Sequence, residues 1–150
     1  MVKFEQVKRL KDEVIKLPTR ATSGSVGYDF YAIEDIELPA GELTRIPTGI
    51  KCKMTPFMVL VLANRSSNPS KRNLMLANGV GIIDSDYYGN ASNDGEIMFE
   101  FYNFSKKPVI IEKGEKIGQG FITHIVRVEN DVVESPDAVR DGGFGSTDKK

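Results

Sequence analysis

Short runs of apolar residues recur along the whole chain, separated by glycine, proline and polar turns. The runs are rich in Val, Ile, Phe and Tyr, the residue types that favour β-strands. Short runs of this kind at regular spacing predict an all-β sandwich or barrel. The expected strands cover residues 4–10, 28–32, 36–38, 43–46, 50–54, 58–63, 79–83, 96–104, 109–111, 117–122 and 125–128.

The sequence between these runs predicts how some of them are connected. The Pro47-Thr48-Gly49 turn predicts a hairpin between strands 43–46 and 50–54. The continuous apolar run 58–63 predicts a strand that is buried on both faces. Helix signals are sparse: residues 11–17 predict about one turn before Pro18, and residues 67–73 predict a short helix after a capping residue.

Composition narrows the class of protein. The chain has 150 residues, which predicts one domain, and a net charge of −1, which argues against attachment to nucleic acid or anionic lipid by bulk charge. A single cysteine, Cys52, and a single histidine, His124, exclude a disulfide framework and a His-rich or multi-Cys metal centre. We expect Cys52 in the core and His124 as an ordinary strand residue. No apolar run is long enough for a membrane span and no signal architecture opens the chain, so we expect a cytoplasmic protein.

The last residues differ in kind from the rest. Residues 140–150 are too rich in glycine and polar residues to fold alone, so we expect a core domain at 1–139 followed by a C-terminal arm. The segment by itself is typical of a frayed terminus. Alternatively, it is an arm that becomes ordered on a ligand, with Phe144 stacking and glycine amides near an anion.

Two segments carry candidate chemistry. Arg65-Ser66-Ser67 follows an apolar strand and offers a guanidinium, two hydroxyls and loop amides, which suit a phosphate group. Residues 78–90 run from an apolar strand into two carboxylates and two tyrosines, a pattern that can hold a planar ligand and supply a general base. A solvated serine-rich turn and an exposed acidic turn are the respective alternatives.

Five segments, taken together and in this order along the chain, form a pattern. They are Gly27-Tyr28-Asp29-Phe30-Tyr31-Ala32, Arg65-Ser66-Ser67, residues 78–89 centred on Ile83-Asp84-Ser85-Asp86-Tyr87, Lys113-Gly114-Glu115-Lys116-Ile117-Gly118-Gln119, and Arg140 with Gly142-Gly143-Phe144-Gly145-Ser146-Thr147. In these segments and their order the chain resembles the trimeric dUTPase (deoxyuridine triphosphate nucleotidohydrolase) family, over nearly its whole length. The resemblance implies a jelly-roll-like β-barrel or sandwich, a homotrimer, and an arm that closes over a neighbouring subunit's site.

The resemblance also implies an activity and the residues that carry it. The reaction would be Mg²⁺-dependent hydrolysis of dUTP to dUMP and pyrophosphate, with Asp84 activating the water that attacks the α-phosphorus. Tyr87 would pack on the deoxyribose and Phe144 would stack on the uracil. Matching positions assign uracil reading to Asn78, Gly79 and Ile83; phosphate contacts to Arg65, Ser66, Ser67, Arg140, Gly145, Ser146 and Thr147; and water-mediated metal contacts to Asp29 and Gln119.

The chain departs from the family pattern at several places. Asn64 stands where glycine or proline is common, Gly118 stands where alanine is frequent, and residues 89–96 look like an insertion whose tip we expect to be flexible and exposed. Two other functions stay open. A dCTP deaminase shares the arginine-serine turn but would not carry Asp84, Tyr87 and the arm motif. A non-catalytic protein could use the inserted loop to bind a partner, and a regulatory partner of an active enzyme is undetermined.

Overall fold

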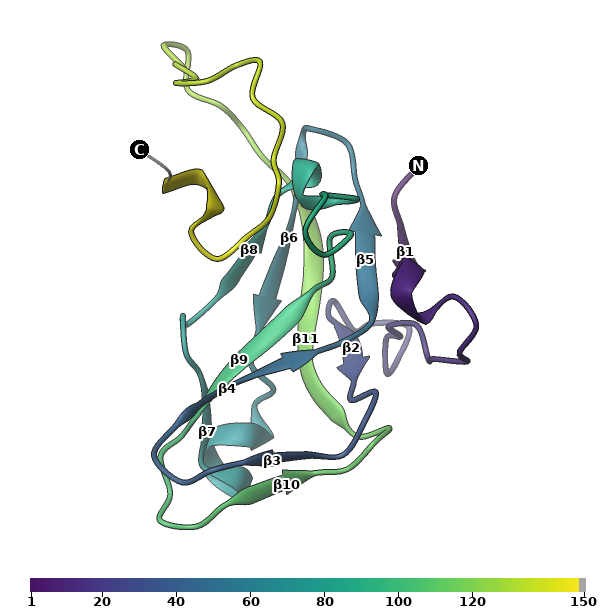
Figure 1. The fold of residues 1–150 in the computed structure, drawn as a ribbon, viewed down its shortest axis with the longest axis vertical. Coiled ribbons are helices and arrows are strands. Elements are labelled where there is room, and N and C mark those ends of the chain that lie inside the picture. Colours follow the sequence, from purple (N-terminus) through teal and green to yellow (C-terminus); the bar gives the residue numbers. More distant parts are fainter. Residues whose placement is uncertain (149–150) are drawn as a thin grey trace.

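Antiparallel strands dominate the fold, which is described over residues 1–148 by a computed structural model (Figure 1). The larger sheets have the strand orders β2-β11-β6-β8 and β4-β9-β7, and the pairs β1-β5 and β10-β3 complete the fold. This is the expected all-β, jelly-roll-like class. The strands are β1 (Lys3–Gln6), β2 (Tyr28–Tyr31), β3 (Ile36–Leu38), β4 (Leu43–Pro47), β5 (Ile50–Lys53), β6 (Met58–Ala63), β7 (Leu74–Leu76), β8 (Gly81–Ile83), β9 (Met98–Asn103), β10 (Val109–Ile111) and β11 (Lys116–His124).

The core lies between the sheets and is built from alternate residues of their strands. Three phenylalanines at its centre, Phe30, Phe99 and Phe101, are fully buried and in ring contact along the series. Cys52 is 2% exposed and belongs to the same cluster, as predicted, and burial raises the pKa of its thiol to about 12. The thiol is therefore held in its neutral form as a small apolar side chain.

The predicted hairpin at Pro47-Thr48-Gly49 is wrong. Strand β4 pairs with β9, and β5 pairs with β1, so the chain crosses from one sheet to another at this turn. Thr48 explains the crossing: its hydroxyl donates to the Ile97 carbonyl at 2.6 Å and accepts from the Ile50 amide at 3.2 Å. Gly49 turns the chain with φ +71°.

Several predicted boundaries also need correction. The first strand ends at Gln6, where a 3₁₀ turn, η1 (Lys8–Leu10), begins. Residues 11–17 form no helix. Strand β11 extends the predicted run 117–122 to His124, and residues 125–128 form no strand. Strand β6 alternates buried and half-buried residues instead of being buried on both faces.

The predicted helix at 67–73 is present as a single π-type turn, η2 (Asn68–Arg72). The Ser67 side chain makes no capping hydrogen bond to it. The turn ends at Asn73, whose φ of 55° places it in the left-handed region that asparagine tolerates.

Gly118 is required by the packing of β11 against the core. A Cβ built on Gly118 would lie 2.2 Å from Cε1 of Phe99, an atom of a fully buried ring. The Phe99 ring thus occupies the space that an alanine methyl group would need. The two positions form one packing unit.

We predict that Gly118→Ala lowers the free energy of unfolding by about 1–3 kcal/mol, because the Phe99 ring must leave its position. Urea denaturation measures the change. Gly24→Ala is the matched control, since no atom lies within 4 Å of that Cβ, and it should change stability by less than about 0.5 kcal/mol. Adding Phe99→Leu to Gly118→Ala should restore part of the loss. Unchanged stability of Gly118→Ala would contradict the packing described here.

Candidate functional site

A pocket of about 270 Å³ opens beside strand β8, where the C-terminal arm crosses the fold. In Figure 1 the arm descends along β8 before its last turn. The pocket combines apolar walls with carboxylates, an arginine and an aromatic ring. Its lining residues are Leu62, Leu76, Asn78, Gly81, Ile82, Ile83, Asp84, Tyr87, Met98, Glu100, Arg140, Gly143 and Phe144.

Strand β8 is an edge strand and offers its backbone to the pocket. It pairs with β6 on one side, and in residues 1–148 no strand pairs with its other side. An edge strand leaves alternate N–H and C=O groups without a strand partner. A planar ring with donors and acceptors on its rim can bind to such an edge. Gly79 (φ +74°) turns the chain into this strand from Asn78.

Asp84 lies directly after β8 and starts the short turn η3 (Ser85–Tyr87). Its side chain is 52% exposed, and one carboxylate oxygen lies 2.7 Å from Nη2 of Arg140. Arg140 also donates from Nε to Asp86 at 2.8 Å. The arm therefore places a guanidinium between two carboxylates at the pocket mouth.

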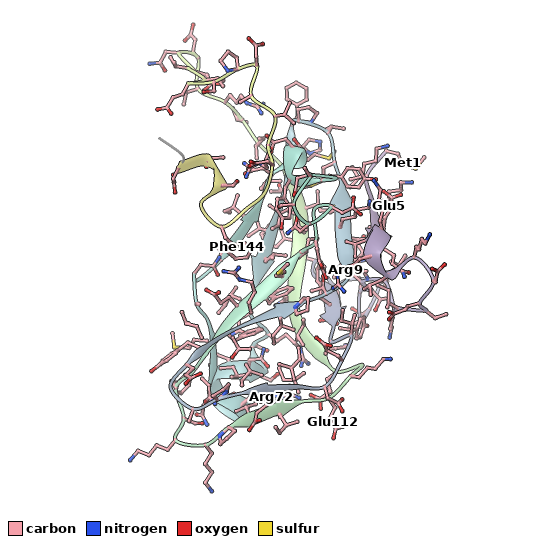
Figure 2. All side chains as sticks on the ribbon, viewed as in Figure 1. Met1, Glu5, Arg9, Arg72, Glu112 and Phe144 are labelled. Atoms are coloured by element: carbon pink, nitrogen blue, oxygen red, sulfur yellow. The ribbon has the colours of Figure 1, made fainter. Side chains whose placement is uncertain are left out.

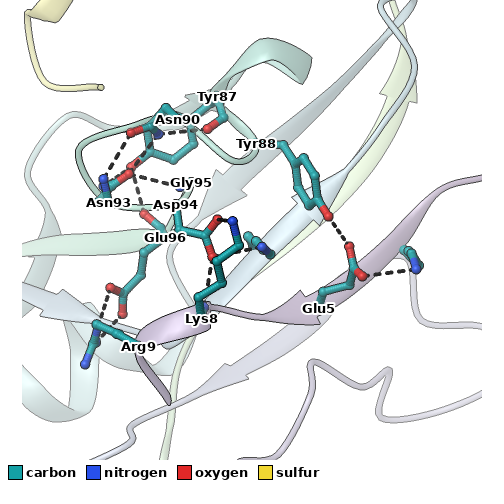
Figure 3. Close-up of polar contacts among 12 residues, drawn as sticks. Glu5, Lys8, Arg9, Tyr87, Tyr88, Asn90, Asn93, Asp94, Gly95 and Glu96 are labelled. Carbon is teal, nitrogen blue, oxygen red and sulfur yellow. Dashed lines mark hydrogen bonds and ion pairs between the residues drawn. The ribbon is translucent and has the colours of Figure 1, made fainter. Parts of the chain in front are cut away.

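Tyr87 is held far more tightly than Asp84. Its ring lines the pocket but is only 6% exposed, and burial raises the pKa of its hydroxyl. The hydroxyl donates to the Glu96 carbonyl and accepts from Nδ2 of Asn93, each at 2.7 Å (Figure 3). The arm touches the same ring, since a Cβ on Gly143 would lie 2.9 Å from a ring carbon of Tyr87.

The arm ends in a tight turn beside the pocket. The backbone of Phe144 has a φ of +52°, and its ring stacks on the guanidinium of Arg45, with 3.6 Å between the guanidinium carbon and the ring centroid. In Figure 2, Phe144 lies on the opposite side of the molecule from Met1 and Glu5. Gly145 follows with φ +95°, and the turn η4 (Ser146–Asp148) comes after it. Gly145, Ser146 and Thr147 do not line the pocket. The Ser146 hydroxyl is buried with no hydrogen-bond partner among the described residues.

The predicted phosphate turn lies elsewhere and is organised by Asn64. The Asn64 side chain accepts from the Arg65 amide at 2.9 Å and from Asn68 at 2.8 Å, and donates to the Leu74 carbonyl at 3.0 Å. Asn64, a departure from the family pattern, therefore stabilises this turn. Arg65 points toward β11, donating to the Lys116 carbonyl at 3.3 Å. Ser66 is exposed and Ser67 is half-buried.

Asp29 and Gln119 face each other in register on β2 and β11. The Asp29 carboxylate lies 2.8 Å from the Lys116 ammonium, and Gln119 donates to the Asn64 carbonyl at 3.0 Å. These residues thus join the Arg65 turn in a second cluster. None of this cluster lines the pocket.

The register of β6 explains the separation of the pocket and the second cluster. Leu60 pairs with Ile83, the residue before Asp84, whereas Ala63 at the end of β6 pairs with Gln119. By this register Asp84 lies level with Val59, six residues before Arg65, so the Arg65 turn lies about 20 Å further along β6 at about 3.3 Å per residue. The two clusters, here called half-sites, are thus separate within one chain.

Sequence reasoning missed several residues that shape the pocket. Met98 and Glu100 line it from β9, and Arg45 of β4 stacks on the Phe144 ring; no motif marked either strand. The loop after Gly89 carries Asn93 and Glu96 to Tyr87; its tip at Ala91 and Ser92 is exposed as expected, but Asn90 and Glu96 are buried. The spacing of polar residues in that loop was the one feature of the sequence that could have indicated its contact with Tyr87.

Two negative findings concern the described part of the chain. Residues 1–148 contain no helix that is both long and apolar enough to traverse a lipid bilayer. They also contain no group of three or more His, Cys, Asp or Glu side chains that could hold a metal ion.

Comparison with known proteins identifies the family. The dUTPase family model matches residues 13–148. The deoxyuridine 5'-triphosphate nucleotidohydrolase of Lactococcus lactis is 42% identical over 144 residues, covering 96% of this chain and 95% of that protein, and the one from Klebsiella pneumoniae is 39% identical with full coverage of both. The crystal structure of the Streptococcus mutans dUTPase superposes with a TM-score of 0.80 at 39% identity, over 85% of this chain and 98% of that one. None of these relatives is named as a deaminase. The chain belongs to the dUTPase family.

Proposed function

We propose that the chain hydrolyses dUTP to dUMP and pyrophosphate at the pocket beside β8. The observation that carries this proposal is the meeting of an open strand edge, the Asp84 carboxylate and the buried Tyr87 ring in one cavity, with Arg140 and Phe144 supplied by the arm. The family membership supports the same reaction. The pocket thus offers a base-reading edge, a general base and a cation for phosphate.

Asp84 is the proposed general base. An exposed carboxylate at the pocket mouth can accept a proton from a water that is held within hydrogen-bond distance. Arg140 now pairs with this carboxylate through one nitrogen, and a triphosphate offers a guanidinium bidentate pairing and a larger negative charge. A bound triphosphate would therefore draw Arg140 away and leave Asp84 free for the water.

The strand edge and Tyr87 account for substrate choice. Backbone donors and acceptors of residues 78–83 can match the rim of uracil, whereas cytosine has its donor and acceptor reversed and would leave buried groups unpaired. The Tyr87 ring would pack against the deoxyribose and leave no room for a 2′-hydroxyl. Phe144 would leave Arg45 and stack on the base.

Mg²⁺ fits the second cluster as a partner of the substrate. The cluster offers oxygen donors, the Asp29 carboxylate and the Gln119 amide, which suit a hard cation that retains most of its water. Asp29 and Gln119 would hold the hydrated ion through water, next to the Arg65 turn. When bound, the cation would neutralise charge that develops on the triphosphate.

The two half-sites support a homotrimer with shared active sites. The phosphate cluster of one chain lies apart from its own pocket, so a complete site would take the cluster from another copy. The exposed linker before the arm supports the same assembly, because Val126, Val132 and Val139 are each at least 85% exposed and would be buried by a neighbouring copy. We therefore propose a core at 1–139 and an arm at 140–150, whose last two residues lie outside the described structure. In the single chain the arm lies on its own pocket, and in the assembly it would make the same contacts on a neighbour's pocket.

Release of pyrophosphate from dUTP, dCTP, dTTP, dATP, dGTP and UTP, with and without Mg²⁺, tests the activity. We expect rapid release from dUTP alone, a large loss when EDTA removes the metal, and no ammonia from dCTP. Activity on dCTP with ammonia release would instead identify a deaminase. No release from any nucleotide would overturn the proposed function.

Asp84→Asn separates catalysis from binding in the same assay. The variant keeps the size and most hydrogen bonds of the side chain but removes the base, so we expect turnover to fall by several orders of magnitude with little change in affinity for dUTP. Asp12→Asn, in the exposed segment after η1, is the matched control and should retain full activity. Near-normal turnover of Asp84→Asn would remove Asp84 from the base role.

Deletion of residues 140–150 should leave a folded, assembled protein with very low activity, because the pocket loses Arg140 and Phe144. Mixing this truncated chain with Asp84→Asn chains, followed by subunit exchange, distinguishes the two directions of closure. An arm that acts on a neighbour restores activity, since intact Asp84 pockets then receive arms from the other chain. An arm that acts only on its own chain restores none, and full activity of the truncated chain alone would exclude a lid.

A further inference from the structure

The loop from Asn90 to Glu96, here named the polar loop, is built around the hydroxyl of Tyr87. This inference rests on the proposed function, in which Tyr87 packs on the deoxyribose. The Tyr87 hydroxyl uses its hydrogen to bond the Glu96 carbonyl and one lone pair to accept from Asn93, each at 2.7 Å (Figure 3). The outer end of the ring is therefore fixed by two directional bonds in a buried setting.

Asn93 is itself held in place by the polar loop. Its side-chain oxygen accepts from Nδ2 of Asn90 at 2.8 Å and from the Gly95 amide at 3.0 Å. Asn90 is buried and donates to the Tyr87 carbonyl at 2.8 Å. Hydrogen bonds from the polar loop thus hold both the backbone and the hydroxyl of Tyr87. Because Asn93 is itself held by hydrogen bonds, its side chain cannot move with a displaced Tyr87 ring.

Glu96, whose carbonyl is the second partner of the Tyr87 hydroxyl, is held in place by residues outside the polar loop. The Glu96 carboxylate is buried and accepts from the Gly49 amide at 2.9 Å, and from Nε and Nη2 of Arg9 at 2.9 and 2.5 Å. Asp94, next in the loop, pairs with the buried ammonium of Lys51 at 2.8 Å. Hydrogen bonds from Lys51 and the Lys8 amide outweigh burial and lower the pKa of Asp94, so this anchor stays ionised near neutral pH.

The Tyr87 ring must be rigid if it is to reject a ribonucleotide. UTP differs from dUTP by one hydroxyl, and an apolar wall alone rejects an added hydroxyl poorly. A wall that can shift by a fraction of an ångström would admit the 2′-oxygen. We propose that Asn93 is a positioning residue that enforces the preference for dUTP over UTP by fixing the Tyr87 hydroxyl.

The test compares kcat/KM for dUTP and for UTP in wild type, Asn93→Ala, Tyr87→Phe and the double variant. Loss of one buried hydrogen bond predicts a ratio of dUTP to UTP about 3- to 10-fold lower in Asn93→Ala, mainly through better use of UTP. Tyr87→Phe keeps the ring but removes the hydroxyl, so it should lower the ratio similarly. The double variant should be no worse than either single variant, because both act through one hydroxyl.

Asn103→Ala is the matched control for a purely structural role. Asn103, the last residue of β9, is a fully buried asparagine whose side chain bonds the Leu38 carbonyl and the Ser105 amide, neither of which belongs to the polar loop. Asn103→Ala should lower stability without changing the ratio of kcat/KM for dUTP to that for UTP.

The positioning role is overturned if Asn93→Ala lowers kcat/KM equally for both nucleotides, or if the two losses multiply in the double variant. If Asn93→Ala does not fold, Tyr87→Phe decides alone, and a wild-type ratio in that variant overturns the role. Absence of dUTP hydrolysis by wild type would be seen first and would count against the proposed function itself.

Discussion

An unpaired strand edge is the constraint on which the rest of this structure depends. β8 pairs with β6 alone in the described chain and is three residues long, bounded by the Gly79 turn and by Asp84. Open edges invite pairing with other chains, so proteins keep them short or cover them. Here the edge is short and the arm lies next to it, with Arg140 beside Asp84 and Gly143 on Tyr87. The unpaired N–H and C=O groups that could pair with another chain can instead form hydrogen bonds to a base.

Both ends of the chain meet at the polar loop. Arg9 and Lys8, from the N-terminal turn, bind Glu96 and Asp94 across 86 or more positions of sequence, and the Ser92 amide donates to the Asp141 carbonyl at 3.1 Å. Directional polar bonds suit this place better than apolar packing, because they fix an orientation and not only a contact. The loop therefore links the stability of the N-terminal segment to the geometry of the pocket and to the seating of the arm.

The sequence was most informative about the strands and about the segment that contributes most of the pocket. Apolar runs located nearly every strand, and Asn78, Ile83, Asp84 and Tyr87 of the segment around β8 do share one cavity with Arg140 and Phe144. Strand partners were not predictable, because the Pro47-Thr48-Gly49 turn has the composition of a hairpin yet is fixed as a crossing by a hydrogen bond to Ile97. The roles of Asn64 and Asn93 could not be predicted either, because the contribution of an asparagine side chain depends on which distant groups its amide contacts in the fold. The assembly was implied only by the family resemblance, and the distance between the half-sites is what gives it physical support.

A crystal structure of the protein with Mg²⁺ and a non-hydrolysable analogue of dUTP tests the central claim most directly. The uracil rim should pair with the backbone of residues 78–83, the deoxyribose should lie on the Tyr87 ring, and Asp84 should hold a water facing the α-phosphorus opposite the pyrophosphate. A nucleotide bound away from the β8 edge, or an Asp84 carboxylate turned away from the α-phosphorus, would contradict it.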